Sequence, residues 1–192
     1  MNVPNRLTVL RVVLTGVIIV VLFMPGLPPK LWAIALFAAA ALSDWLDGYL
    51  ARRWHQITPL GMLWDPIADK VLVIGLLSVF VRLRILPLWM VLVIAVREVA
   101  VTVARAVALR RRVVIAAAKE GKQKAFVQMG TILLALVLIA LREASGGEHV
   151  QRPLHLAVLV GMVVTTALTV QSGVLFFRRH WSVVVGRSSV EP

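Results

Sequence analysis

The stretch SDWLDGYLARRWHQITPLGMLWDPIADK, from Ser43 to Lys70, contains all four aspartates of the chain. It lies within a sequence that is 60% hydrophobic and has a mean hydropathy of +0.90. Carboxylates are costly in apolar segments that enter a membrane, so four of them on neighbouring apolar segments require a chemical reason.

The sequence on either side of this stretch consists of long apolar runs. The 192 residues are enough for one domain, and we expect a single membrane domain over residues 1–192. Each run has about 20 residues, which suffices for a helix to cross the hydrocarbon core of a bilayer. The six runs are residues 7–24, 31–51, 58–80, 87–109, 124–141 and 153–177. The sequence therefore predicts an all-α integral membrane protein with six transmembrane helices and a polar cavity that faces the cytoplasm.

The distribution of basic residues predicts how these helices are oriented. Most lysines and arginines outside the runs lie near the termini or in the second and fourth gaps, including residues 52–53, 110–112 and 119–124. The positive-inside rule then places both termini, and a tail over residues 178–192, in the cytoplasm. We expect a multi-pass protein of the cell membrane, whose basic residues on the cytoplasmic side explain the net charge of +12. No nucleic-acid partner is expected, because the basic residues do not form a continuous face.

The four aspartates form two pairs at helical spacing. Asp44 and Asp47 are three residues apart, and Asp65 and Asp69 are four apart, so each pair occupies one face of a helix. The connection between them is short, and Thr58 before a proline is typical of a helix start. We therefore expect four carboxylates at similar depth near the cytoplasmic surface.

Four such carboxylates repel one another unless a cation holds them. Oxygen ligands suit divalent cations, and the chain has no cysteine, so a metal here is bound by oxygen or imidazole. The alternative is that the aspartates are solvated charges beside Arg52 and Arg53. The regular spacing, with small residues between, favours a metal site. Two metals bridging anionic oxygens serve displacement at a diphosphate, and the membrane location predicts a lipid diphosphate.

Two small residues share the face of the first aspartate. Gly48 and Ala51 follow Asp44 by four and seven residues. They leave room for a bulky ligand beside the metal, or they allow close packing of helices; the sequence leaves both possibilities open.

The full pattern of this stretch resembles the signature of the CDP-alcohol phosphatidyltransferases, which reads D, two residues, DG, two, AR, eight, G, three, D, three, D. The matching positions are Asp44, Asp47, Gly48, Ala51, Arg52, Gly61, Asp65 and Asp69. The resemblance implies a homodimeric membrane enzyme with six transmembrane helices, whose substrate is a CDP-linked lipid.

The resemblance also implies a role for each of these positions. Asp44, Asp47 and Asp65 would hold two Mg²⁺ or Mn²⁺ ions, and Asp69 would be a further ligand and the base that takes the proton of the acceptor hydroxyl. The CDP-lipid site would be shaped by Gly48, Ala51, Arg52, Gly61 and Thr58.

Charged residues near the fourth and fifth runs predict an acceptor site. Arg97 and Arg105 lie eight residues apart, so both can face one cavity. With Lys122 and Lys124 they would form a cationic pocket for a phosphate. The alternatives are that Arg97 forms a structural ion pair with Glu98 or a motif carboxylate, and that the lysines are membrane anchors.

Three further stretches resemble the phosphatidylglycerophosphate synthase branch of the family. They are NVPNRLTVLR at 2–11, DPIADK at 65–70, and REVAVTVAR at 97–105 followed by GKQKAFVQ at 121–128. Ala125 departs from the threonine expected there. The resemblance implies transfer of a phosphatidyl group from CDP-diacylglycerol to glycerol 3-phosphate among membrane phospholipids. Cardiolipin synthesis, transfer to inositol phosphate and, more remotely, cation transport are the alternatives.

Overall fold

The computed structural model describes the backbone of residues 3–54, 61–110, 113, 115, 119–144 and 148–185. Within these ranges it describes all side chains except those of 3–8, 44–54, 61–69, 119, 120, 122, 148–150 and 182–185. Every regular element in the described ranges is an α-helix. The helices are α1 (Val3–Phe23), α2 (Leu27–Trp54), α3 (Gly61–Arg82), α4 (Leu88–Arg110), α5 (Lys119–Glu143) and α6 (Glu148–Val185).

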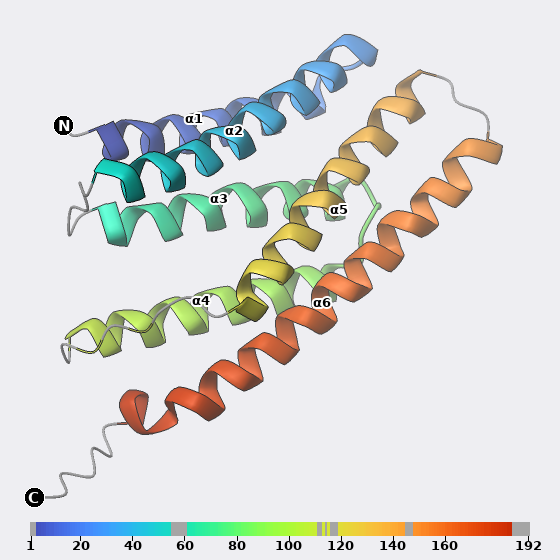
Figure 1. The fold of residues 1–192 in the computed structure, drawn as a ribbon. Helices are drawn as coiled ribbons and strands as arrows, with labels where there is room; N and C mark the ends of the chain where they lie inside the picture. The colour runs from blue at the N-terminus through green and yellow to red at the C-terminus, as the bar shows by residue number, and fades with distance from the viewer. Residues whose placement is uncertain are drawn as a thin grey trace, which may run out of the picture.

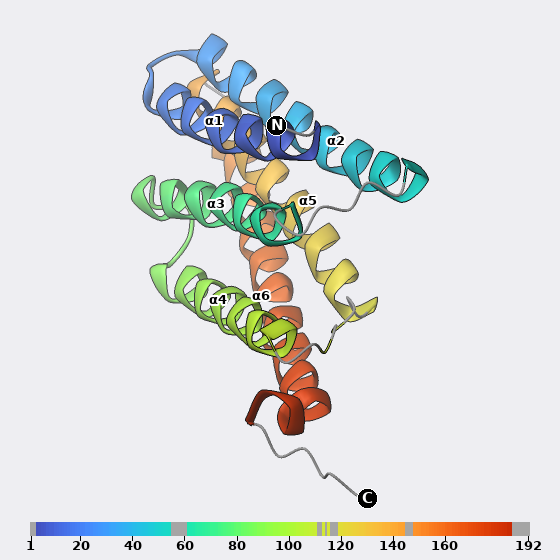
Figure 2. The same cartoon turned by 90° about the vertical axis from the view of Figure 1, so that its left-hand side faces the viewer.

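The first four helices form a stack, and the last two cross it. α1 packs against α2 and α3, and α3 packs against α4. α5 contacts α2, α3 and α6, while α6 contacts α4 (Figure 2). In Figure 1, α1 begins and α6 ends on the left-hand side, where α2 also ends and α3 begins. The end of α2 and the start of α3, which carry the predicted aspartate region, therefore lie on the same side of the molecule as the start of α1 and the end of α6.

The opposite side of the bundle is held by a buried lysine. Gly26, at φ +91°, turns the chain between α1 and α2, and a glycine adopts this conformation without steric cost. Lys30 then donates hydrogen bonds from Nζ to the carbonyl oxygens of Leu22, at 2.7 Å, and Met24. Its ammonium also lies 3.7 Å from Glu143 Oε1. One cation thus satisfies carbonyls at the end of α1 and connects them to α2 and α5.

The core lies where the stack meets the crossing helices. Its fully buried side chains come from all six helices and include Ile18, Phe37, Leu76, Phe80, Ile94, Leu136 and Met162. α5 and α6 approach closely at Gly161, where an added Cβ would lie 2.7 Å from Thr131 Oγ1. The absence of a side chain at Gly161 therefore allows this contact.

A helix coincides with each of the six predicted segments, and several helices extend beyond the predicted limits, furthest at the start of α5 and at both ends of α6. α5 begins at Lys119 rather than at residue 124, because the sequence KEGKQK consists mainly of good helix formers. α6 covers residues 148–185 rather than 153–177, so it includes much of the predicted tail. Pro153 lies in its second turn, where a proline forfeits a single helical hydrogen bond and does not end the helix.

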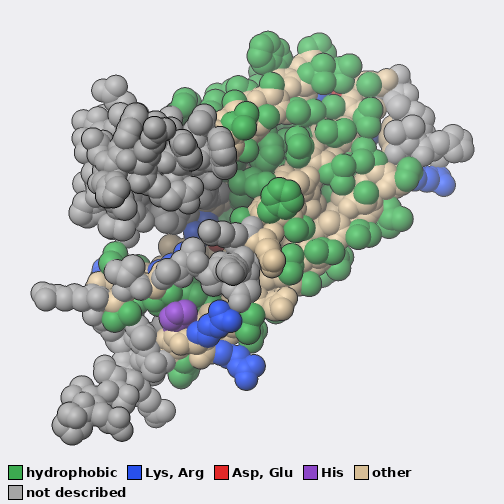
Figure 3. All heavy atoms as spheres, in the orientation of Figure 1, with side chains coloured by type: hydrophobic (Ala, Val, Ile, Leu, Met, Phe, Trp, Pro, Cys, Tyr) green, Lys and Arg blue, Asp and Glu red, His purple; other side chains and the backbone are tan. Residues whose placement is uncertain are grey.

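The surface of the described residues is strongly apolar. Hydrophobic side chains cover most of the described surface in Figure 3. Large exposed examples are Trp32, Val96, Phe126 and Leu156. By length and composition, Gln123–Glu143 and Gln151–Trp181 are able to cross a membrane, and the described parts of α1 and α2, Val9–Phe23 and Leu27–Ser43, are also apolar.

Candidate active site

The helices place the aspartate signature on two consecutive elements. Asp44 and Asp47 lie on α2, and Asp65 and Asp69 lie near the start of α3. Because the backbone is helical at these positions, each pair shares a helix face, as the spacing predicts. The other signature residues are also on these helices: Gly48, Ala51 and Arg52 on α2, and Gly61 at the start of α3. The side chains of these residues, and Thr58 altogether, lie outside the described part of the structure, so the predicted metal and CDP-lipid contacts stay predictions.

A cluster of charged side chains lies where α3, α4 and α5 meet. Its centre is Glu98 of α4, whose Oε1 accepts hydrogen bonds from Arg97 Nη1, at 3.0 Å, and from Lys124 Nζ of α5. Lys70 Nζ, on α3, lies 3.7 Å from Glu98 Oε2. We call these four residues the Glu98 cluster. Lys70 directly follows Asp69, so the cluster adjoins the predicted catalytic aspartate in sequence.

The Glu98 cluster is largely removed from solvent and is unevenly charged. The exposed fractions of its side chains run from 6% for Lys124 to 19% for Lys70. Among the described side chains, three cations face this one carboxylate. Several cationic side chains in a weakly hydrated position attract an anion such as a phosphate.

Arg97 is held by a second helix as well. Its Nη2 donates a hydrogen bond of 3.0 Å to Ser172 Oγ on α6. The Ser172 hydroxyl in turn donates to the Thr169 carbonyl oxygen at 3.1 Å. An added Cβ at Gly173 would lie 3.0 Å from Arg97 Cγ, so the absence of a side chain at Gly173 allows Arg97 to pack against α6. Arg97 Nε is buried and has no hydrogen-bond partner among the described residues.

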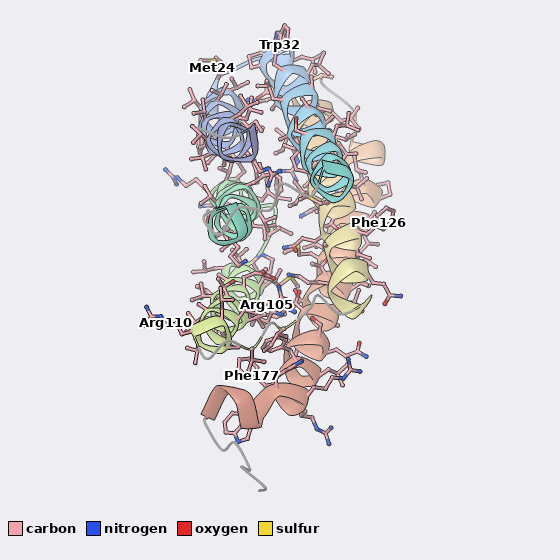
Figure 4. All side chains as sticks on the ribbon, turned by 60° about the vertical axis from the view of Figure 1, so that its left-hand side comes forward. Met24, Trp32, Arg105, Arg110, Phe126 and Phe177 are labelled. Carbon is pink, nitrogen blue, oxygen red and sulfur yellow. The ribbon has the colours of Figure 1, made fainter. Side chains whose placement is uncertain are left out.

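Arg105 lies two turns further along α4 and also contacts α6. Its guanidinium carbon is 5.7 Å from the centroid of the Phe176 ring, within the range of a cation–π interaction. Figure 4 shows Arg105 on the side of α4 that faces α6, whereas Arg110 points away from the bundle. Arg97 and Arg105 thus occupy one side of α4, as their spacing predicts. Lys122 lies on the first turns of α5, and its side chain is outside the described residues.

The sequence offers two interpretations of Arg97: an ion pair with Glu98, and a part in a phosphate-binding pocket. The ion pair of Arg97 with Glu98 is present, at 3.0 Å. It does not exhaust the positive charge, because Lys124 and Lys70 share the same carboxylate. The phosphate-binding role of Arg97, Arg105, Lys122 and Lys124 stays a prediction.

An apolar groove of about 920 Å³ runs between α4 and α6 and reaches the Glu98 cluster at Arg97. Its walls are largely aliphatic, with Arg178 and Trp181 among the lining residues from the end of α6. Arg97 lines this groove and also contacts Glu98, so it lies between an apolar channel and a cationic cluster. An amphiphilic ligand has both kinds of surface.

Sequence reasoning missed a set of buried polar residues on α5 and α6. Gln128, one turn after Lys124, is buried, and its Nε2 has no hydrogen-bond partner among the described residues. On α6, Thr165 and Thr169 are fully buried and donate to carbonyls of their own helix. Their position in an otherwise apolar run was the available signal, because buried polar residues in such runs usually face the protein interior.

Comparison with known proteins defines the family. The model of the CDP-alcohol phosphatidyltransferase family matches residues 1–171 of the chain. The chain belongs to this family. The resemblance carried by the eight signature positions is therefore confirmed.

Several bacterial relatives carry names that refer to phosphatidylglycerophosphate synthesis. The "probable phosphatidylglycerophosphate synthase" of Mycobacterium tuberculosis is 39% identical over 181 residues, which cover 93% of this chain and 81% of the relative. The "CDP-diacylglycerol–glycerol-3-phosphate 3-phosphatidyltransferase" of Bacillus subtilis is 32% identical, with 94% and 95% covered. A protein of the same name from Pseudomonas fluorescens is 44% identical over 108 residues, or 55% of each chain.

Proposed function

We propose that this protein transfers the phosphatidyl group of CDP-diacylglycerol to sn-glycerol 3-phosphate, which yields phosphatidylglycerophosphate and CMP. Membership of the CDP-alcohol phosphatidyltransferase family supports the transfer chemistry. The names of the relatives in M. tuberculosis and B. subtilis support the acceptor. The structural observation that supports the acceptor assignment is the Glu98 cluster, whose three cationic side chains suit a phosphate group.

The reaction is a direct displacement at phosphorus. A hydroxyl oxygen of glycerol 3-phosphate attacks the phosphorus that carries diacylglycerol, and the bond from that phosphorus to the CMP oxygen breaks. Asp69 takes the hydroxyl proton, and Arg52 stabilises the departing CMP. Arg97 and Lys124, with Arg105 and Lys122 nearby, hold the acceptor phosphate so that its hydroxyl reaches the donor. No covalent intermediate with the protein is required.

The aspartates are suited to hold divalent metal ions. Four carboxylates on two helical segments, at spacings of three and four residues, form an oxygen-only donor set. Mg²⁺ and Mn²⁺ prefer such ligands, and Asp44, Asp47, Asp65 and Asp69 would hold two of these ions. Bound there, the ions supply neutralisation of the diphosphate charge.

The same proposal places the protein in the cell membrane. All six helices would span the bilayer, with both termini and the aspartate region on the cytoplasmic side and the protein acting as a homodimer. The exposed aliphatic surface supports the membrane environment, because a soluble protein rarely exposes large apolar patches. The start of α1 and the end of α6 on one side of the bundle support an even number of crossings (Figure 1).

Other acceptors differ in the charge that they offer to the Glu98 cluster. Phosphatidylglycerol, the acceptor in cardiolipin synthesis, presents a phosphodiester with one negative charge. Its attraction to Arg97 and Lys124 is therefore weaker than that of a phosphate monoester. Inositol phosphate is also a monoester, so it is the second candidate acceptor.

Release of CMP tests this proposal. Purified protein in mixed micelles with CDP-diacylglycerol and Mg²⁺ or Mn²⁺ receives glycerol 3-phosphate, inositol phosphate or phosphatidylglycerol in separate assays. We expect CMP release with glycerol 3-phosphate only, and its loss in Asp69→Asn. Release with another acceptor alone would move the acceptor assignment, and release with none would refute the proposed transfer.

A further inference from the structure

Glu98 joins cations that are far apart in sequence. Lys124 lies 26 residues after it, on another helix, and Lys70 lies on a third. Both carboxylate oxygens of Glu98 take part, one toward Arg97 and Lys124 and the other toward Lys70. A single side chain therefore sets the relative positions of three cations on three helices.

The burial of these residues makes the carboxylate necessary. The Lys124 side chain is 6% exposed and Glu98 is 15% exposed. A buried ammonium without its counter-ion is strongly unfavourable, so it moves toward solvent or toward another partner. Glu98 thus keeps Lys124 at its place beside Arg97.

Two effects of Glu98 on an incoming phosphate oppose each other. Its negative charge repels the phosphate and lowers affinity. Its contacts hold Lys124, Arg97 and Lys70 in one arrangement before the phosphate arrives, which raises affinity because no ordering of three long side chains is then needed. The geometry favours the second effect, since Oε1 and Oε2 of Glu98 are already occupied by the three cations.

We propose that Glu98 is a positioning residue for the acceptor: its carboxylate holds Lys124, Arg97 and Lys70 in the arrangement that receives the acceptor's phosphate dianion. This inference rests on the proposed function for the identity of the acceptor. It assigns to Glu98 no contact with the reacting atoms.

Binding of the acceptor alone tests this role without any turnover. Glycerol 3-phosphate is titrated calorimetrically into purified protein in mixed micelles that lack CDP-diacylglycerol. We expect Glu98→Gln to bind it at least about tenfold more weakly than the unaltered protein, equivalent to about 1.4 kcal/mol. Glu98→Asp keeps the charge but shortens the reach, so its affinity is expected to lie between the two.

A matched control is present at the other side of the bundle. Glu143 pairs with the buried Lys30 at 3.7 Å, far from the Glu98 cluster in the fold, and Glu143→Gln removes the same charge. We expect this variant to bind glycerol 3-phosphate as the unaltered protein does. In steady-state assays Glu98→Gln is expected to raise the KM for glycerol 3-phosphate while the KM for CDP-diacylglycerol changes less than about twofold.

The outcomes separate this inference from the proposed function. Equal or tighter binding by Glu98→Gln would overturn the inference, because it would show that Glu98 only neutralises charge. No binding by the unaltered protein would overturn it as well. Binding that depends on Glu98, in a protein that releases no CMP with glycerol 3-phosphate, would support the inference and refute the proposed function. If Glu98→Gln does not fold, Glu98→Asp decides, and an affinity equal to that of the unaltered protein refutes the role.

Discussion

Replacement of Gly173 by alanine perturbs the acceptor site without changing its charge. The new Cβ would lie 3.0 Å from Arg97 Cγ and 3.7 Å from its Nε. Ordinary carbon contacts are about 3.5 to 4.0 Å, so the arginine must move away from α6 by about half an ångström. That movement lengthens the hydrogen bond from Arg97 Nη2 to Ser172 Oγ, which is 3.0 Å long.

The size of the effect follows from this hydrogen bond. Bonds that involve a charged group contribute about 1.5 to 3 kcal/mol, and partial loss costs about 1 to 2 kcal/mol. We therefore expect Gly173→Ala to raise the KM for glycerol 3-phosphate about five- to thirtyfold, as measured by CMP release, with the KM for CDP-diacylglycerol unchanged.

Gly130→Ala is the matched control, because an added Cβ at Gly130 meets nothing within 4 Å. It makes the same chemical change in another apolar helix, and its KM values should equal those of the unaltered protein. An unchanged KM for glycerol 3-phosphate in Gly173→Ala would refute the reasoning, because it would deny a role for Arg97. An equal rise in the KM values for glycerol 3-phosphate and CDP-diacylglycerol would also refute it, because it would indicate a general distortion of the protein.

Three further predictions concern stability and metal dependence. Lys30→Met leaves two carbonyls at the end of α1 without their donor and Glu143 without its cation. It should therefore lower the free energy of unfolding by about 2 to 4 kcal/mol, measured by thermal unfolding in micelles. An unchanged unfolding midpoint would contradict this prediction. Gly161→Ala places a Cβ 2.7 Å from Thr131 Oγ1 and should destabilise the contact of α5 with α6 by about 1 to 3 kcal/mol, whereas Gly130→Ala should not destabilise the protein. Removal of divalent ions by a chelator should abolish CMP release, and added Mg²⁺ or Mn²⁺ should restore it; activity that persists after chelation would contradict the metal assignment.

The helices and the placement of the signature could be predicted from the sequence, because both depend on local patterns. Each apolar run became a helix, and the aspartate pairs lie on α2 and α3 as their spacing indicates. The helix ends were less predictable. Residues 119–123 and 178–185 are polar or follow charges, and the sequence could not show that neighbouring turns would extend through them.

The Glu98 cluster was only partly predictable, because its contacts depend on tertiary packing. The sequence shows Arg97, Glu98 and Lys124 as ionisable residues near apolar runs. It does not show that one carboxylate would serve three cations. The contact of Arg97 with Ser172 spans 75 residues, and no local pattern relates these positions. The space that Gly173 leaves for Arg97 also cannot be predicted from the sequence, because it depends on how α4 and α6 pack together.

The acceptor of the phosphatidyl group is the central claim, and the product itself tests it most directly. Purified protein is incubated with CDP-diacylglycerol, Mg²⁺ and deuterium-labelled glycerol 3-phosphate, and the lipids are analysed by mass spectrometry. We predict deuterated phosphatidylglycerophosphate in amounts equal to the CMP released. CMP formed without label in the lipid fraction would contradict the claim, because the phosphatidyl group would then have gone to water or to another acceptor.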